Sequence, residues 1–111
     1  MFNEVVIIGK LATKPVIKEV QNGKKMSMIV VDVLRPYRNN LGIRDHDYIS
    51  CVLWSGIASQ VNECCDIGSF LGIKGRLQSK TFESNERQTT TIMEVKAEHV
   101  EFLDKYFYEG K

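Results

Sequence analysis

The chain has 111 residues and a formal net charge of +1, with 15 basic and 14 acidic side chains. Its length supports one domain with a sizeable core but not two, and its hydrophobic content of 43% is ordinary for a globular protein. Uninterrupted apolar runs such as Val5–Ile8 are far too short to span a bilayer. The first residues lack the basic and hydrophobic segments of a secretory signal. These properties argue against a membrane protein and predict a cytoplasmic location.

The cysteine and histidine residues do not form a metal-binding or catalytic pattern. Cys51, Cys64 and Cys65 lack metal-ligand spacing, and His46 and His99 have no nearby Cys or His to complete a zinc set. Adjacent cysteines form strained bridges, so we expect buried free thiols rather than a redox pair. The alternative is an enzyme with Cys51 or Cys64 as nucleophile and His46 or His99 as base, but no third group or oxyanion motif accompanies them. We therefore predict no enzymatic activity, no metal and no cofactor.

The first predicted strand covers Asn3–Leu11 and is apolar on both faces. In a small domain such a strand needs a partner subunit or a second layer over its outer face. Gly9 lies inside this strand, where a bulge or a sharp bend would suit it. Pro15 interrupts the pattern, which resumes as strand over residues 16–20.

The dipeptide Asn22-Gly23 stands between two strand-like runs and predicts a hairpin turn. The return strand covers Met26–Leu34, and a loop over residues 35–45 follows, because a proline, two asparagines and a glycine interrupt the alternation. A third strand covers Asp47–Trp54. We expect it to carry alternate side chains on two different faces.

The only helical pattern begins at Ile57, where apolar residues recur every three or four positions, and Gly68 is a candidate helix end. Two further strands are predicted over Phe70–Ser79 and Gln88–Phe102, separated by a polar loop at residues 81–87.

This order of elements predicts an all-β fold, a five-stranded OB-fold barrel with one short helix between strands 3 and 4. We assign residues 1–104 to this domain and residues 105–111 to a short C-terminal extension. The OB-fold binds its ligands on strands two and three and on the loops that join strands one–two and four–five.

Four aromatic side chains stand singly among turn-forming, hydroxyl and basic residues: Tyr37, Tyr48, Trp54 and Phe82. Burial in the core is the alternative role, as for most aromatics. Their positions on strand three and in the loops after strands two and four lie on or next to the binding surface of the predicted fold. Rings interleaved with cations suit unpaired nucleic acid, because each base offers a face for stacking and each phosphate a negative charge. The basic residues in or beside these segments are Arg35, Arg38, Arg44, Lys74, Arg76, Lys80 and Arg87.

Three segments resemble the DNA-binding domain of bacterial single-stranded DNA-binding proteins: Asn3–Leu11, Ile49–Trp54 and Gly68–Leu77. Pro15 and Asn22-Gly23 follow the first segment at the family's spacing. The resemblance covers residues 3–103, and the order and spacing of the motifs carry it rather than any one motif. Because the chain ends without the acidic C-terminal tail usual in the family, it resembles a short form.

The resemblance implies the roles of individual residues. Tyr37, Tyr48, Trp54 and Phe82 match the base-stacking positions, with tyrosines at 37 and 48 where tryptophan is usual, so we expect weaker stacking there. Each basic residue alone is more often a solvated charge, but those that we assign to phosphates are Lys10, Arg35, Arg38, Lys74, Arg76 and Lys80.

The predicted function is sequence-independent binding and protection of single-stranded DNA in replication, recombination or repair. The resemblance implies a homotetramer, with a dimer as the alternative, located in the cytoplasm with the nucleoid. RNA stays open as a ligand, because stacking recognises a base and not a sugar.

The alternative from another class is a dimeric adaptor in replication restart, similar to primosomal replication protein N. It would bind replication or primosome proteins. The small net charge, the missing tail and the cluster Tyr106-Phe107-Tyr108 favour this alternative.

Overall fold

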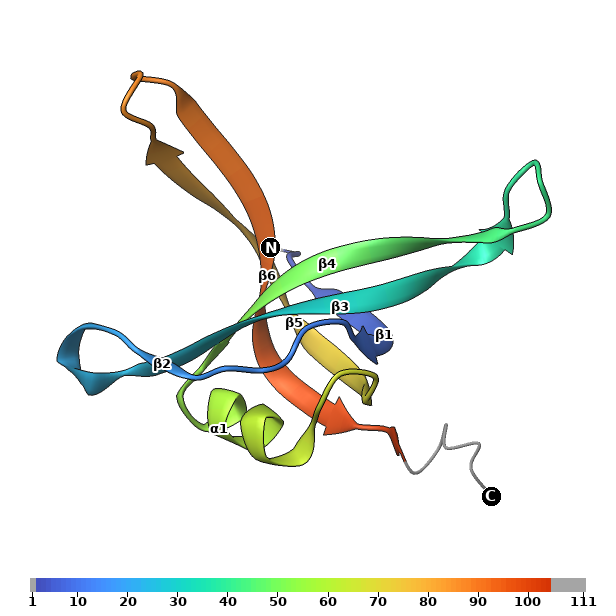
Figure 1. Ribbon diagram of the computed structural model, residues 1–111, viewed down its shortest axis with the longest axis horizontal. Coiled ribbons are helices and arrows are strands. Elements are labelled where there is room, and N and C mark those ends of the chain that lie inside the picture. Colours follow the sequence, from blue (N-terminus) through green and yellow to red (C-terminus); the bar gives the residue numbers. More distant parts are fainter. Residues whose placement is uncertain (1, 105–111) are drawn as a thin grey trace.

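The computed structural model describes residues 2–104, which form a small β-barrel with two projecting hairpins (Figure 1). The predicted C-terminal extension and the Tyr106–Tyr108 cluster lie outside the described residues. The elements in chain order are β1 (Val5–Leu11), β2 (Lys18–Glu19), the 3-10 turn η1 (Gln21–Gly23), β3 (Lys25–Arg38), β4 (Arg44–Trp54), α1 (Ser55–Cys64), β5 (Phe70–Glu83) and β6 (Thr89–Phe102).

Five strands close the barrel. They pair in the order β1-β5-β6-β4-β3, and β3 pairs back to β1 through Lys10↔Asp32 and Leu11↔Val31. All pairs are antiparallel except β4 with β6. This closed five-stranded arrangement with one helix confirms the predicted OB-fold. The helix follows the strand that ends at Trp54, as expected, but it lies between β4 and β5 because the short β2 is a separate strand.

The barrel core consists of alternate residues from the five long strands. Ile29 and Val31 of β3 point inward together with Leu53 of β4, and α1 adds Ala58 and Val61. The period-two burial follows from the pleat of each strand, which sends successive side chains to opposite faces. The helix packs on the barrel with its two fully buried residues, which is why an amphipathic segment stands at this point of the sequence.

Two glycines allow strands to approach more closely than a side chain would permit. A Cβ atom on Gly9 would lie 2.3 Å from the carbonyl oxygen of Asp32, where β1 turns to meet β3. A Cβ atom on Gly75 would lie 2.0 Å from the carbonyl oxygen of Lys96, beside a register shift between β5 and β6. Gly9 therefore lies at the point of barrel closure, where the absence of a side chain allows the two backbones to approach closely.

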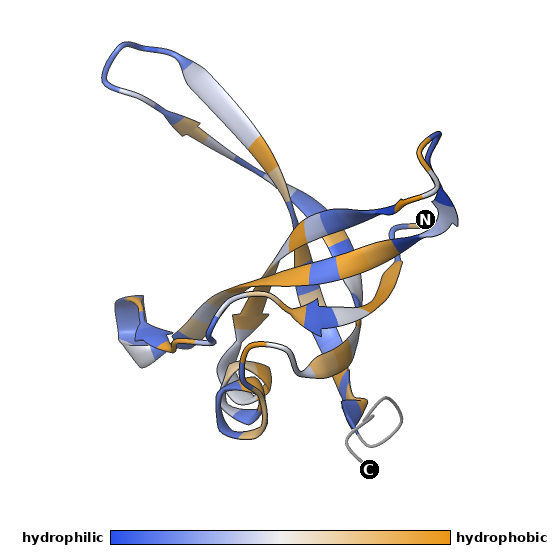
Figure 2. Cartoon of the chain, turned by 45° about the vertical axis from the view of Figure 1, so that its right-hand side comes forward, coloured by the Kyte–Doolittle hydropathy of each residue, from blue (hydrophilic) through white to orange (hydrophobic). Residues whose placement is uncertain are grey.

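The two long hairpins correct the prediction of long loops. The loop expected over residues 35–45 shortens to residues 39–43, because β3 continues to Arg38 and β4 begins at Arg44. Arg38 pairs with Arg44 beyond a register irregularity. Residues 81–87 likewise shorten to a tight turn, because the β5–β6 ladder runs to Glu83↔Thr89. Figure 2 shows that the outer part of the β5–β6 hairpin is largely hydrophilic. A strand with two solvated faces lacks the apolar alternation from which a strand is predicted.

The remaining predictions differ only at element ends. The Asn22-Gly23 hairpin is confirmed, since Lys18 pairs with Met26 across it. The segment at 16–20 contains only two strand residues, and α1 ends at Cys64, before the expected stop at Gly68. Within residues 2–104 no helix is both long and apolar enough to cross a membrane.

Candidate nucleic-acid interface

Tyr48 and Trp54 lie on the same outer face of the barrel. Both belong to β4, whose alternate residues Cys51 and Leu53 fill the core. Tyr48 is 65% exposed, and Trp54 is partly buried at the end of the strand. The two residues are six positions apart on the strand, which at about 3.3 Å per residue is a distance of about 20 Å. Along one strand of B-form DNA the same distance spans about six phosphates. The two rings therefore cannot stack on adjacent bases.

Tyr37 and Phe82 lie on the two projecting hairpins rather than in loops. Tyr37 is near the end of β3 and 64% exposed, and Phe82 is near the end of β5 and 49% exposed. The β3–β4 and β5–β6 hairpins leave the barrel in different directions (Figure 1). The structure thus exposes Tyr37, Tyr48 and Phe82, so core burial does not account for these three rings.

A histidine extends the aromatic surface at Tyr48. The rings of His46 and Tyr48 stack with centroids 6.2 Å apart and planes 16° from parallel. The Nδ1 atom of His46 lies 2.5 Å from Oδ1 of Asp32, which is opposite Tyr48 on β3. In the sequence, His46 is a candidate only for a metal-binding or catalytic role. Its position two residues before Tyr48, on the same strand face, was the available indication of this role.

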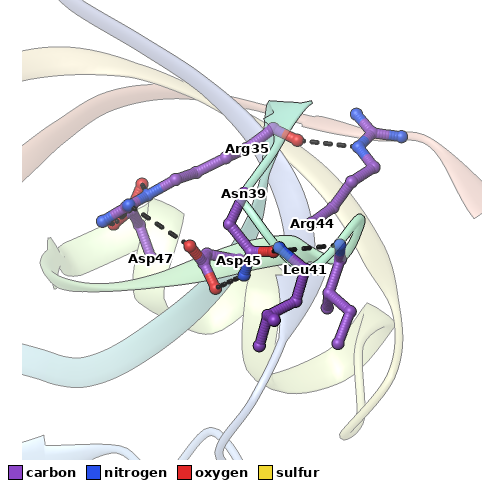
Figure 3. Close-up of polar contacts among 7 residues, drawn as sticks. Arg35, Asn39, Leu41, Arg44, Asp45 and Asp47 are labelled. Carbon is purple, nitrogen blue, oxygen red and sulfur yellow. Dashed lines mark hydrogen bonds and ion pairs between the residues drawn. The ribbon is translucent and has the colours of Figure 1, made fainter.

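Arg35 is held by acidic side chains at the base of the β3–β4 hairpin (Figure 3). Its Nε lies 3.1 and 3.0 Å from the two carboxylate oxygens of Asp47, and a terminal nitrogen lies 2.8 Å from Oδ1. Asp45 lies 3.8 Å from the guanidinium. The hydrogen bonds between Arg35 and Asp47 raise the pKa of the guanidinium and lower the pKa of the Asp47 carboxyl. Arg35 was assigned to phosphates, but its fork is already occupied.

Arg38 and Arg44 support the same hairpin through backbone carbonyls, and Figure 3 shows the contact made by Arg44. Arg38 donates to the carbonyl of Gly42 at 2.8 Å, and Nε of Arg44 donates to the carbonyl of Arg35 at 2.8 Å. The Asn39 side chain accepts the backbone N–H groups of Leu41 and Ile43 and closes the turn. Both arginines keep further N–H donors, because each guanidinium has five.

The other predicted cations are distributed over the barrel surface. Lys74 lies 3.4 Å from Glu4, and Arg76 lies 3.9 Å from Glu98. Both are exposed ion pairs, which are weak and easily exchanged for a phosphate. Lys80 forms no ion pair within residues 2–104 and lies on the same face of β5 as Phe82.

Lys10 lies near the Tyr48 end of the surface. Its ammonium is 5.1 Å from the centroid of the Phe70 ring. It lines a cavity of about 280 Å³ together with Asp32 and His46. Lys74 lines a different hollow of about 190 Å³, beside the exposed β1 residues Val6 and Ile8.

A second group of residues was not recognised from the sequence. A cavity of about 450 Å³ beside Trp54 is lined by Lys24, Ser55, Gln78 and Lys96. These residues come from four segments that only barrel closure brings together, so no sequence pattern could have indicated the group.

Cys51 and Cys65 are protonated thiols near neutral pH. Burial raises the pKa of Cys51 to about 12 and that of Cys65 to about 11. Cys64 is exposed. Residues 2–104 contain no group of three or more His, Cys, Asp or Glu side chains that could hold a metal ion.

An OB-fold barrel with exposed rings on one outer face and on two hairpins defines the class: an oligonucleotide-binding type of OB domain. Residues 2–103 match the single-strand binding protein family, so the chain belongs to that family.

Curated relatives agree with this family. The chain is 36% identical over 104 residues to a single-stranded DNA-binding protein of Halalkalibacterium halodurans, with 94% of the chain and 62% of the relative covered. It is also 36% identical to single-stranded DNA-binding protein A of Bacillus subtilis, and the match covers 94% of the chain and 60% of that protein. The chain is 32% identical to single-stranded DNA-binding protein B of Bacillus subtilis, and this match covers 94% of the chain and 92% of that protein. The chain thus spans about three fifths of the length of the first two relatives.

Proposed function

We propose that this protein binds single-stranded DNA without sequence preference and protects it during replication, recombination or repair. The observation that carries the proposal is the exposure of Tyr37, Tyr48 and Phe82, with Trp54 at the surface, on an OB barrel of the single-strand binding protein family. The names of the three relatives above support the same ligand.

Binding rests on stacking and on charge. Each base that stacks on an exposed ring contributes about 1–3 kcal/mol, and all four bases have such a face. A duplex keeps its bases stacked on one another and offers none, so unpaired strands are preferred. The cations assigned to phosphates are Lys10, Arg35, Arg38, Lys74, Arg76 and Lys80.

Those cations are not equivalent. Lys80 faces the same side as Phe82 and has no described acidic partner, so it makes the strongest case among the six. Arg35 makes the weakest, because Asp47 already occupies its fork.

The protein acts as a homo-oligomer, a tetramer rather than a dimer, in the cytoplasm beside the nucleoid. The support is the outer face of β1, where Val6 is 69% and Ile8 is 52% exposed beside an apolar hollow. Exposed apolar surface of this kind calls for cover by a second copy, and symmetric association is the usual solution. Ile8→Lys should lower the mass measured in solution, whereas Val16→Lys, at an equally exposed residue outside β1, should not.

The test of function is competition between strands. Excess unlabelled oligo-thymidine should displace a labelled oligo-thymidine from the protein, and an equal amount of duplex should not. Equal competition by the duplex would contradict the stacking mechanism. The family and the three relatives carry single-strand-binding names, and nothing in the described residues favours the primosomal adaptor.

A further inference from the structure

The cavity beside Trp54 combines the side chains that one nucleotide unit needs. Its lining contains one indole ring, two ammonium groups, one amide and one hydroxyl, from Trp54, Lys24, Lys96, Gln78 and Ser55. Its volume of about 450 Å³ lies within the range of about 300–1,000 Å³ typical of small-ligand sites.

The two lysines flank Trp54 from opposite sides. Trp54 ends β4, and β4 lies between β3 and β6 in the barrel. Lys24 directly precedes β3, whose Met26 pairs with Trp54. Lys96 lies on β6 and pairs with Val52 of β4. The cations therefore approach the ring from both neighbouring strands.

These ammonium groups are also unpaired. Neither Lys24 nor Lys96 forms an ion pair with an acidic side chain of residues 2–104, unlike Arg35 and Lys74. A positive charge without a protein partner is free to neutralise a phosphate.

The amide of Gln78 has a fixed orientation. Its Nε2 donates to Oε2 of Glu94 at 2.8 Å, and Glu94 is only 3% exposed. Because the amide nitrogen of Gln78 donates to the buried Glu94 side chain, the amide oxygen of Gln78 remains available as a hydrogen-bond acceptor. Lys80 and Phe82 follow Gln78 on the same face of β5, so this face of the strand leads from the cavity toward the second ring.

We propose that this cavity is a one-nucleotide subsite, in which Trp54 stacks one base and Lys24 and Lys96 each neutralise one of the two phosphates that flank it. The inference rests on the proposed single-stranded DNA binding and adds two residues to it. The ligand is one unit of a phosphodiester strand, not a free nucleotide.

The test is the salt dependence of oligo-thymidine binding. For single strands the logarithm of the binding constant falls with slope about −0.7 per phosphate contact. Lys24→Gln and Lys96→Gln should each reduce the slope by about 0.7, and the double variant by about 1.4. Between about 50 and 200 mM salt, the double variant should therefore lose about sevenfold less affinity than the wild type.

Two controls separate this role from a structural one. Lys14→Gln removes the same charge from an exposed residue outside the cavity and should leave the slope near the wild-type value. The double variant should keep the Trp54 emission of the free protein and the full quench at saturation, because the ring still stacks.

The proposal is overturned if the double variant keeps the wild-type slope, if Lys14→Gln lowers it equally, or if the double variant loses the quench. A wild-type protein that does not bind oligo-thymidine would overturn the proposed function itself, and the subsite with it.

Discussion

The ion pair between Arg35 and Asp47 predicts an unusual variant, one that gains affinity for DNA. The carboxylate of Asp47 binds the Arg35 guanidinium through contacts of 2.8–3.1 Å, so these N–H donors are not available to a phosphate. Asp47→Asn keeps the shape of the side chain but removes the charge. We expect Arg35 to become available for one additional phosphate contact.

The magnitude follows from that single contact. The salt slope should become steeper by about 0.7, so that between about 50 and 200 mM salt the variant loses about 2.6-fold more affinity than the wild type. Arg35→Gln alone should leave the slope nearly unchanged. The double variant Arg35→Gln/Asp47→Asn should return it to the wild-type value.

Oligo-thymidine titrations over a series of salt concentrations measure these slopes. Glu63→Gln is the matched control, because it makes the same change in net charge at an exposed residue of α1. An equal gain in Glu63→Gln would mean that net charge alone is responsible. A wild-type slope in Asp47→Asn, or the loss of a full contact in Arg35→Gln, would refute the reasoning.

Acid should disturb the same pair. Because folding lowers the Asp47 pKa below its ordinary value of 3.8, the pair contributes its full stabilisation above that value. The contribution is lost as the pH falls through the lower, folded-state pKa. Near neutral pH the charge on Asp47 persists, so the titrations above are independent of small changes in pH.

Three further predictions concern the second ring, barrel closure and the thiols. Phe82→Ala should weaken oligo-thymidine binding by about 1–3 kcal/mol without changing the melting temperature, and an unchanged affinity would remove Phe82 from the stacking surface. Gly9→Ala should destabilise the fold by about 1–3 kcal/mol in thermal melts at fixed protein concentration, because its Cβ would lie 2.3 Å from a carbonyl oxygen. Gly56→Ala, which has open space around it, should not destabilise, and equal losses would contradict the closure argument. The Cys51 pKa of about 12 predicts slow maleimide labelling of native Cys51 and fast labelling of exposed Cys64, with stability falling above the ordinary thiol value of 9.0; fast labelling of Cys51 would contradict its burial.

The barrel could be predicted from the sequence because its strands bury one face. Along β3, the buried Ile29 and Val31 alternate with the more exposed Met28, Val30 and Asp32, and this period-two pattern indicates a strand directly. The same alternation placed Tyr48 and Trp54 together on the outer face.

The hairpins could not be predicted to their full length. Thr89, Thr90 and Thr91 are all exposed, so both faces of the β5–β6 tip are solvated and no apolar pattern marks it. In the β3–β4 hairpin, Pro36 indicates a loop in the sequence. In the structure β3 nevertheless continues to Arg38, with an irregular register between Leu34 and Arg38.

The electrostatic partners depend on register and closure. Arg35 meets Asp47 because β3 and β4 pair, and Lys24 approaches Lys96 because β4 lies between their strands. A pattern in sequence gives the charges but not which of them already have a partner. For that reason the sequence predicts Arg35 as a phosphate ligand and does not indicate Lys24 or Lys96.

The most direct test of the account is the fluorescence of Trp54 during titration with oligo-thymidine. The chain contains one tryptophan, so the emission reports on this position alone. We predict a saturable quench whose binding constant falls as salt rises, and a loss of about 1–3 kcal/mol of binding free energy in Trp54→Ala, followed by anisotropy of a labelled oligonucleotide. An unchanged emission together with no binding of the labelled strand would contradict the central claim that this barrel holds single-stranded DNA by stacking.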